Sequence, residues 1–244
     1  MTEPAVEIGE RISSNKSRDT RLVYRGHCDG RPAIIKAFSH PSRGWLHWRR
    51  CDFNARMIRR RGIPAPVIYY SGWLSQPGAW VIIYELLEQA REFRWIKQAP
   101  DADARTRGLE QLVALFAHMH EKGTIQADTT LGNFLQQEDQ VYVVDEDRIK
   151  IRPWPLGQRA AMKSLASVLT QIPVEDPEEI RHLYHFYCKQ RDWEPGDKGA
   201  RRLEKNMQWF REWRKNKKLF RIKKTALIAA LPIIIIFTVI FSVI

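Results

Sequence analysis

The chain has 244 residues, of which 44% are hydrophobic and 28% are charged, and this composition excludes a disordered or fibrous protein. That length is enough for one sizeable core, or for two lobes around a cleft. The net charge of +12 would suggest a nucleic-acid-binding protein if it were evenly spread. However, residues 201–224 hold 11 Lys or Arg and 2 Glu, so the excess lies in one short stretch and the remainder is nearly neutral. We therefore expect no nucleic-acid partner.

The N-terminal part of the chain is predicted to be β-rich. Residues 1–20 are polar and are expected to form an extension without regular structure, and residues 21–90 form a β-rich lobe. Two β-rich runs flank Asp29-Gly30, which is typical of a hairpin. A helix ended by Gly62 follows, and the turn at residues 76–78 predicts a second hairpin.

Residues 91–200 are predicted to form a helical lobe. Apolar residues recur at helical spacing between Leu109 and Met119, and Gly123 is expected to end that helix. A short buried strand then runs into acids at residues 140–148. Two more helices are predicted over 158–170 and 177–190.

The C-terminal part predicts a membrane anchor. Residues 201–225 are basic and interleaved with aromatic side chains, a pattern that favours contact with anionic membrane lipids. Residues 226–244 are apolar and long enough as a helix to span a bilayer. The cations on the upstream side keep the preceding domain in the cytoplasm. The three cysteines show no CxxC spacing, which indicates neither a disulfide framework nor a zinc site.

Three residues carry the pattern of a phosphoryl-transfer site. Asp128 precedes Asn133 by five residues, and Asp145 ends an apolar strand. Carboxylate and amide oxygens suit Mg²⁺, and an attacking hydroxyl needs a positioned base. Lys36, in a β-rich run, supplies a cation for the phosphates. Each residue also has a purely structural interpretation: Lys36 extending to solvent, Asn133 capping a turn, and Asp145 pairing with Arg148.

In this order the motifs resemble the eukaryotic-type protein kinase fold in a reduced form. More specifically, they resemble the bacterial lipopolysaccharide-core kinases, the Kdo/heptose kinase family. The resemblance covers about residues 20–170 and is carried by IIKAF (Lys36), RGWLHWRR (43–50), RRGIPAP (60–66), HEKG (120–123), DTTLGNFL (128–135) and YVVDEDR (142–148).

The resemblance implies a role for each residue. Asp128 is the catalytic base that accepts the proton of the attacking hydroxyl. Lys36 contacts the α- and β-phosphates of ATP, and Asn133 and Asp145 are the metal ligands for Mg²⁺. The backbone at Glu85 and Leu87 binds the adenine.

Four features depart from the family pattern. No Gly-rich loop precedes Lys36, and the helix position where a glutamate partner is expected holds Cys51. Gln126 stands where kinases commonly have His. No activation segment ending in Ala-Pro-Glu follows Asp145, which argues against a protein substrate.

The predicted fold class is therefore α+β, a two-lobed protein-kinase-like domain with a C-terminal transmembrane helix. The predicted function is an ATP-dependent kinase of a sugar hydroxyl in the lipopolysaccharide core, anchored at the cytoplasmic face of the inner membrane. Its partners are that glycolipid and anionic membrane lipids, and the sequence does not indicate an oligomeric state. The alternatives are a membrane-tethered pseudokinase that acts as a binding module, and a kinase for a small soluble sugar-like substrate.

Overall fold

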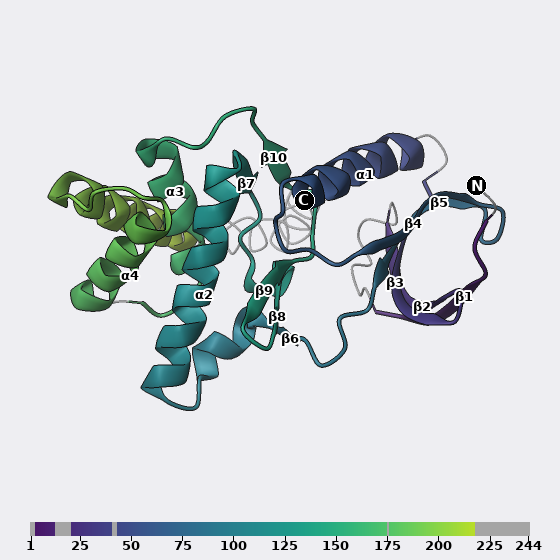
Figure 1. Ribbon diagram of the computed structural model, residues 1–244, viewed down its shortest axis with the longest axis horizontal. Coiled ribbons are helices and arrows are strands. Elements are labelled where there is room, and N and C mark those ends of the chain that lie inside the picture. Colours follow the sequence, from purple (N-terminus) through teal and green to yellow (C-terminus); the bar gives the residue numbers. More distant parts are fainter. Residues whose placement is uncertain (1–2, 13–20, 41–42, 175, 218–244) are drawn as a thin grey trace, which may run out of the picture.

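The computed structural model describes residues 3–12, 21–40, 43–174 and 176–217. A β-rich part and a helical part lie at opposite ends of the molecule (Figure 1). The β-rich part is a five-stranded antiparallel sheet of order β1-β2-β3-β5-β4, with one helix beside it. Its elements are β1 (Val6–Arg11), β2 (Leu22–Cys28), β3 (Arg31–Phe38), α1 (Gly44–Arg60), β4 (Ile68–Leu74) and β5 (Ala79–Glu85).

Both predicted hairpins are confirmed. Asp29 and Gly30 join β2 to β3 with φ angles of 50° and 74°, the left-handed pair that a tight two-residue loop requires. The turn at residues 76–78 joins β4 to β5. Local turn chemistry is therefore enough to define these two strand pairs.

The prediction that residues 1–20 are loop is wrong, because strand β1 lies within them. β1 pairs antiparallel with β2, with Ile8 opposite Gly26. A Cβ atom on Gly26 would lie 2.0 Å from the carbonyl oxygen of Glu7, so the two strands approach at a distance that only glycine permits. Nearly every residue of β1 is exposed, and such a strand lacks the apolar alternation that a sequence pattern can detect.

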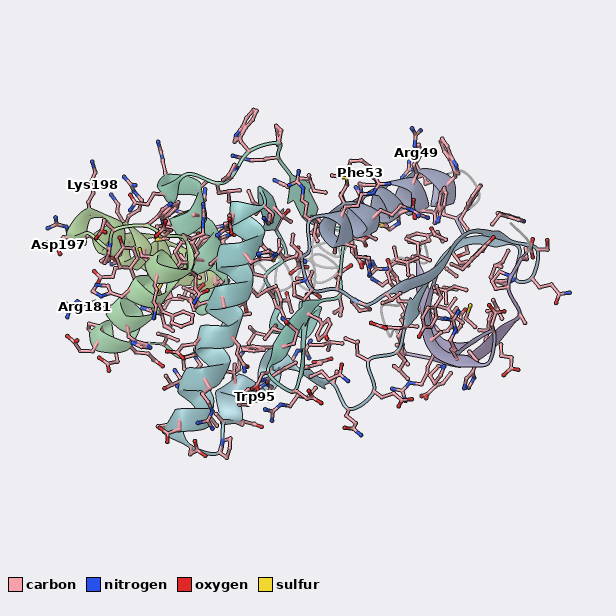
Figure 2. The ribbon with its side chains drawn as sticks, viewed as in Figure 1. Arg49, Phe53, Trp95, Arg181, Asp197 and Lys198 are labelled. Atoms are coloured by element: carbon pink, nitrogen blue, oxygen red, sulfur yellow. The ribbon has the colours of Figure 1, made fainter. Side chains whose placement is uncertain are left out.

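Helix α1 packs one face against the sheet. Cys51 and Ala55, four residues apart on that face, are buried. Arg49 and Phe53 project outward from α1 (Figure 2), and Phe53 is 56% exposed. Gly62 follows the end of the helix with a φ of 70°, as the sequence predicts.

The helical part surrounds a second, larger core. Short strands form a β10-β7 pair and a β6-β8-β9 sheet at its boundary with the β-rich part. Its elements are β6 (Arg91–Glu92), η1 (Phe93–Gln98), α2 (Ala102–Glu121), β7 (Thr124–Gln126), η2 (Leu131–Asn133), β8 (Phe134–Gln137), β9 (Gln140–Val143), β10 (Ile149–Ile151), α3 (Gln158–Leu169), α4 (Pro177–Gln190) and a last helix over residues 197–217.

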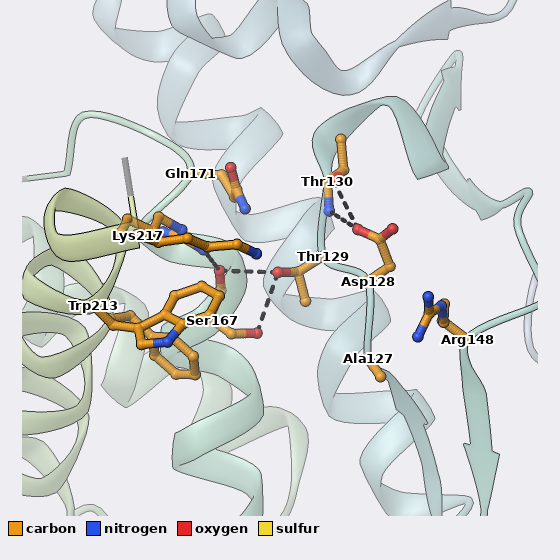
Figure 3. Close-up of a pocket in the computed structure, with 11 residues that line it drawn as sticks. Ala127, Asp128, Thr129, Thr130, Arg148, Ser167, Gln171, Trp213 and Lys217 are labelled. Atoms are coloured by element: carbon orange, nitrogen blue, oxygen red, sulfur yellow. Dashed lines mark hydrogen bonds between the residues drawn. The ribbon is translucent and has the colours of Figure 1, made fainter. Parts of the chain in front are cut away.

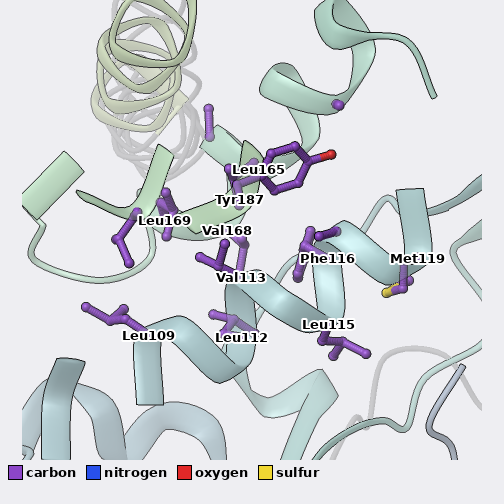
Figure 4. Packing of buried hydrophobic residues seen from close by; sticks show 14 of the residues in the cluster. Leu109, Leu112, Val113, Leu115, Phe116, Met119, Leu165, Val168, Leu169 and Tyr187 are labelled. Carbon is purple, nitrogen blue, oxygen red and sulfur yellow. The ribbon is translucent and has the colours of Figure 1, made fainter. Parts of the chain in front are cut away.

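The predicted helical pattern of this part is confirmed. Leu112 and Phe116 of α2 pack with Leu165 of α3 and Tyr187 of α4, and all four are fully buried (Figure 4). Because α2 presents its apolar face to both other helices, this core fixes where the loop after α2 emerges.

The predicted fold class, a two-lobed protein-kinase-like domain with a C-terminal transmembrane helix, is wrong as stated. Within the described ranges, no helix is long and apolar enough to cross a membrane. The last described helix, 197–217, carries charged residues along its whole length and does not qualify. The predicted span over 226–244 lies outside the described residues. The structure supports an α+β fold.

Candidate active site

Asp128 lies in the loop between β7 and η2, and neighbouring residues orient its carboxylate. Its Oδ1 accepts hydrogen bonds from the Thr130 backbone N–H at 3.2 Å and from the Thr130 hydroxyl at 2.7 Å (Figure 3). The side-chain amide of Asn133 donates to the Asp128 carbonyl oxygen at 3.0 Å. Within the part of the chain that the structure describes, Oδ2 of Asp128 has no hydrogen-bond partner. That oxygen is therefore available to accept a proton.

Gln126 connects this loop to the segment that carries Asp145. Its Nε2 donates to the Asp145 carbonyl oxygen at 2.8 Å, and its Oε1 accepts from the Asp128 N–H at 3.2 Å. The Val144 N–H also donates to the Asn133 carbonyl oxygen at 3.1 Å. Asp128, Asn133 and Asp145 thus lie on adjoining, hydrogen-bonded segments. The side chain of Gln126, a departure from the kinase pattern, links Asp128 to Asp145.

The ammonium group of Lys36 is held in a buried ion pair. Its Nζ donates to Glu146 Oε2 and to the Val144 carbonyl oxygen, both at 2.8 Å. The two side chains of the ion pair are 10% and 2% exposed. Burial alone would lower the pKa of Lys36, but the carboxylates of Glu146 and Asp145 outweigh burial and raise that pKa. Lys36 is therefore a fixed cation at the acidic segment and does not extend to solvent.

The carboxylate of Glu146 is a contact of Lys36 that the sequence pattern does not reveal. The partner of Lys36 was expected on the helix, at the position of Cys51, but the carboxylate comes from the residue after Asp145. Asn54 of α1 donates from Nδ2 to the Glu146 carbonyl oxygen at 2.8 Å, which holds the helix to this segment. The available signal was the run of three acids at 145–147, more carboxylates than a single metal ligand requires.

Arg21 binds both of the other acids in that run. Its Nη1 lies 3.1 Å from Asp145 Oδ1 and also contacts Asp147 Oδ2. Burial alone would lower the pKa of Arg21, but the two carboxylates outweigh burial and raise it. Asp145 therefore pairs with Arg21 and not with Arg148, the partner that the sequence suggested.

The oxygen donors around Asp145 fit a hard divalent cation such as Mg²⁺. Asn133 uses its amide nitrogen on Asp128, and within the described ranges its amide oxygen has no hydrogen-bond partner, so this oxygen is left for a cation. Arg21 contacts Oδ1 of Asp145, and Oδ2 has no partner among the same residues. These are the two ligands that the sequence predicted, although the guanidinium of Arg21 competes with a cation for Asp145.

Glu85 and Leu87 lie where β5 leaves the sheet, beside a groove of about 500 Å³. The Leu86 N–H between them donates to the Pro32 carbonyl oxygen at 3.2 Å, so this amide is already bonded. In the register of β2 with β3, Arg25 and His27 of β2 lie on the same face of the sheet as Lys36. Both residues line the groove. Glu85 and Leu87 flank the groove without lining it. Its lining includes Gly9, Arg25, His27, Pro32, Leu86 and Glu88.

A further cluster lies on α1, next to the acidic segment. His47 Nε2 is 3.1 Å from Asp147 Oδ1, and Cys51 Sγ contacts the same oxygen. Burial raises the pKa of the Cys51 thiol, and the charge of Asp147 raises it further. Burial would also raise the pKa of Asp147, but the hydrogen bond from His47 and the charge of Arg21 outweigh burial and lower it.

A second cavity, of about 540 Å³, opens at Asp128. The loop after β7 and α3 form two of its walls, and the last helix forms another (Figure 3). Arg214 of that helix donates from Nη2 to the Ser167 carbonyl oxygen at 2.8 Å, which fixes the helix against α3. The sequence alone gives no sign that this basic segment lies near Asp128, because the fold brings the two segments together. The polar and aromatic lining includes Asp128, Arg148, Gln171, Trp213, Arg214 and Lys217.

No protein-family model matches the chain, and the comparison with curated proteins gives no match. A functional assignment therefore depends on the geometry of this site and on the resemblance of its motifs.

Proposed function

We propose that the chain is an ATP- and Mg²⁺-dependent kinase that phosphorylates a sugar hydroxyl of a lipopolysaccharide core. One observation carries the proposal: the oriented carboxylate of Asp128 faces a cavity lined by three cationic side chains and an indole ring. These are Arg148, Arg214, Lys217 and Trp213. The choice of a lipopolysaccharide-core sugar as the acceptor rests on the resemblance of the motifs to the lipopolysaccharide-core kinases. A glycolipid acceptor places the enzyme at the cytoplasmic surface of the inner membrane.

In this proposal the chain positions both reactants. Asp128 accepts the proton of the acceptor hydroxyl as its oxygen forms a bond to the γ-phosphorus of ATP, and the bond to the β,γ-bridging oxygen breaks to release ADP. Lys36 contributes positive charge to the phosphates. Asn133 and Asp145 would hold Mg²⁺, which neutralises phosphate charge when it is bound. The groove beside Leu86 is large enough to receive the base.

The cavity at Asp128 supports an anionic sugar as the acceptor. Arg148 and Lys217 are exposed cations, so they can pair with an acidic group on the sugar. The indole of Trp213 offers an apolar face, and Lys217 Nζ lies 4.6 Å from its centre. These residues surround the candidate base, so a sugar bound among them would have its hydroxyls near Asp128.

The first prediction concerns the catalytic base. We expect Asp128→Asn to reduce phosphate transfer at least about 100-fold, because the amide cannot accept the hydroxyl proton. The measurement is transfer of label from γ-labelled ATP, with Mg²⁺, into a membrane extract that contains lipopolysaccharide. The matched control is Asp139→Asn, an exposed carboxylate that accepts a hydrogen bond from Gln111 at 3.1 Å away from the site.

The destination of the label decides the assignment. Label in the glycolipid that persists with Asp139→Asn and disappears with Asp128→Asn supports the proposal. Label in a small soluble sugar keeps the kinase and overturns the lipid acceptor. Absence of transfer from the wild-type chain overturns the kinase assignment altogether.

The second prediction concerns the acceptor cavity. We expect Arg148→Gln and Lys217→Gln each to raise KM for an anionic acceptor about five- to tenfold, because each removes about 1–1.4 kcal/mol of charge-assisted binding. KM for ATP should stay unchanged, since neither residue lines the groove beside Leu86. Lys150→Gln is the control, because this exposed lysine of β10 is not part of the cavity lining. An equal change in all three variants would contradict the acceptor site.

A non-enzymatic nucleotide-binding module is the second candidate function. The specific observation in its favour is the guanidinium of Arg21, which already neutralises Asp145 and Asp147. Under this alternative, ATP binds without turnover and Asp128→Asn leaves the binding unchanged. Measuring nucleotide affinity and label transfer on the same preparations separates the two functions.

A further inference from the structure

We propose that His47, Cys51 and Asp147 form a binding site for a transition-metal ion, with Zn²⁺ as the best-fitting ion. The site lies on α1 beside the candidate active site. It does not depend on the proposed kinase function, because it uses neither Asp128 nor Asn133.

Two elements bring the three donors together. His47 and Cys51 are four residues apart on α1, so both side chains lie on one face of the helix. Asp147 comes from the acidic segment and meets them across the interface. One nitrogen, one sulfur and one oxygen all lie within 4.8 Å of one another. In a tetrahedral site with zinc bonds of about 2.0–2.3 Å, neighbouring donors are about 3.3–3.8 Å apart, so small side-chain shifts would admit the ion.

The donor types select the ion. A thiolate, an imidazole and one carboxylate suit Zn²⁺, whereas Mg²⁺ and Ca²⁺ prefer oxygen ligands throughout. Binding would replace the thiol proton of Cys51, which passes to solvent, and the ion's two charges would balance one thiolate and one carboxylate. Three protein ligands leave the fourth position for water. CxxC spacing cannot reveal this site, because its ligands come from separate segments.

Two neighbouring side chains contact the ligands. Arg21 binds Oδ2 of Asp147 and leaves Oδ1 for the ion. The ring of Phe38 packs edge-on against His47, with ring centres 5.0 Å apart. Cys51 is 2% exposed, and the side chains of His47 and Asp147 are 21% and 16% exposed, so the site is sheltered and still open to solvent. A bound ion would tie α1 to the segment that carries Asp145 and Glu146.

The test uses Co²⁺ as a spectroscopic substitute for Zn²⁺ on the full chain after treatment with a chelator. We expect one Co²⁺ per chain, with a thiolate-to-cobalt charge-transfer band in the near ultraviolet and the strong visible bands of a tetrahedral ion. Added Zn²⁺ should remove both signals by displacement and should raise the Tm of the wild-type chain.

Matched variants assign the ligands. We expect His47→Gln to weaken binding by more than the roughly 10–100-fold that loss of an outer-shell partner costs, and Cys51→Ser to abolish the charge-transfer band. Asp52→Asn and Cys28→Ser should bind as the wild type does, since Asp52 pairs with Arg56 at 2.8 Å and Cys28 is buried in a different cluster. If Cys51→Ser fails to fold, the Co²⁺ affinity of His47→Gln decides whether the site exists, because the His47 side chain is partly exposed and its replacement is better tolerated. A wild-type chain without the charge-transfer band, or unchanged affinity in His47→Gln, overturns the site.

Discussion

Replacing Glu146 with glutamine is expected to lower the free energy of unfolding by about 3–5 kcal/mol, the usual cost of removing one partner from a buried ion pair. The ammonium of Lys36 would remain in a site where its side chain is 10% exposed, without the carboxylate that pairs with it at 2.8 Å. The Val144 carbonyl oxygen and the ring of Tyr84, 4.9 Å from Nζ, cannot replace that charge. Removing Glu146 alone should therefore lower the free energy of unfolding more than removing both Lys36 and Glu146.

Urea denaturation of the wild type and of two further variants tests this. Lys36→Met combined with Glu146→Gln should recover part of the lost stability, because the double change removes the unpaired ammonium. The cation that then lacks the Glu146 carboxylate is Arg59, which lies 3.8 Å from it and whose side chain is 19% exposed. Glu178→Gln is the control: its pair with Arg181 lies at the surface, with side chains 76% and 52% exposed, and should contribute no more than about 1 kcal/mol. Equal losses in Glu146→Gln and Glu178→Gln would show that the Lys36 pair is not a buried charge pair.

What the sequence could predict was set by local interactions. The hairpin at Asp29-Gly30 and the end of α1 at Gly62 depend on residues that tolerate a positive φ, and both were predictable. Helix α2 followed from its apolar periodicity, because one face of it is buried. The sequence spacing of Asp128 and Asn133 corresponds to a direct hydrogen bond within one loop.

What could not be predicted depends on contacts between distant segments. The partner of Lys36 was sought on α1, yet Glu146, 110 residues along the chain, occupies that role. Strand β1 is exposed and has no apolar signature, so only its pairing with β2 defines it. The last helix forms a wall of the Asp128 cavity through another long-range contact. Arg214 donates a hydrogen bond to the carbonyl oxygen of Ser167, 47 residues earlier in the chain. Local patterns suggest the candidate site residues, and the fold supplies their partners.

A buried histidine in the helical core makes stability depend on pH. His120 is 0% exposed, and its Nδ1 lies 3.0 Å from the Tyr187 hydroxyl oxygen. That oxygen also accepts a hydrogen bond from Arg191 Nη1 at 2.7 Å. Among the described residues, the buried Nε2 of His120 has no hydrogen-bond partner. Burial, together with the charge of Arg191, lowers the pKa of His120 to about 3.

The sign of the pH effect follows from that lowered pKa. In the unfolded chain histidine takes up a proton near pH 6.5, whereas the folded chain resists protonation until about pH 3. The stabilisation is complete above the unfolded value and is lost as the pH falls through this window, at up to roughly 1.4 kcal/mol per pH unit. Between pH 7 and pH 4.5 we expect His120 to account for a loss of about 2–3 kcal/mol in the free energy of unfolding.

Urea unfolding of the wild type, His120→Gln and His182→Gln at pH 7 and pH 4.5 isolates this contribution. Glutamine removes the titration, so the His120→Gln variant should lose about 2–3 kcal/mol less than the wild type over the same interval, whatever its starting stability. His182 is about half exposed and pairs with Glu110 at 2.8 Å, and its replacement should leave the larger pH dependence in place. The acidic side chains are the same in the wild type and in His120→Gln, so their contribution cancels in that comparison. Parallel losses in the wild type and His120→Gln would mean that the core admits a protonated His120, which its contacts with Tyr187 and Arg191 oppose.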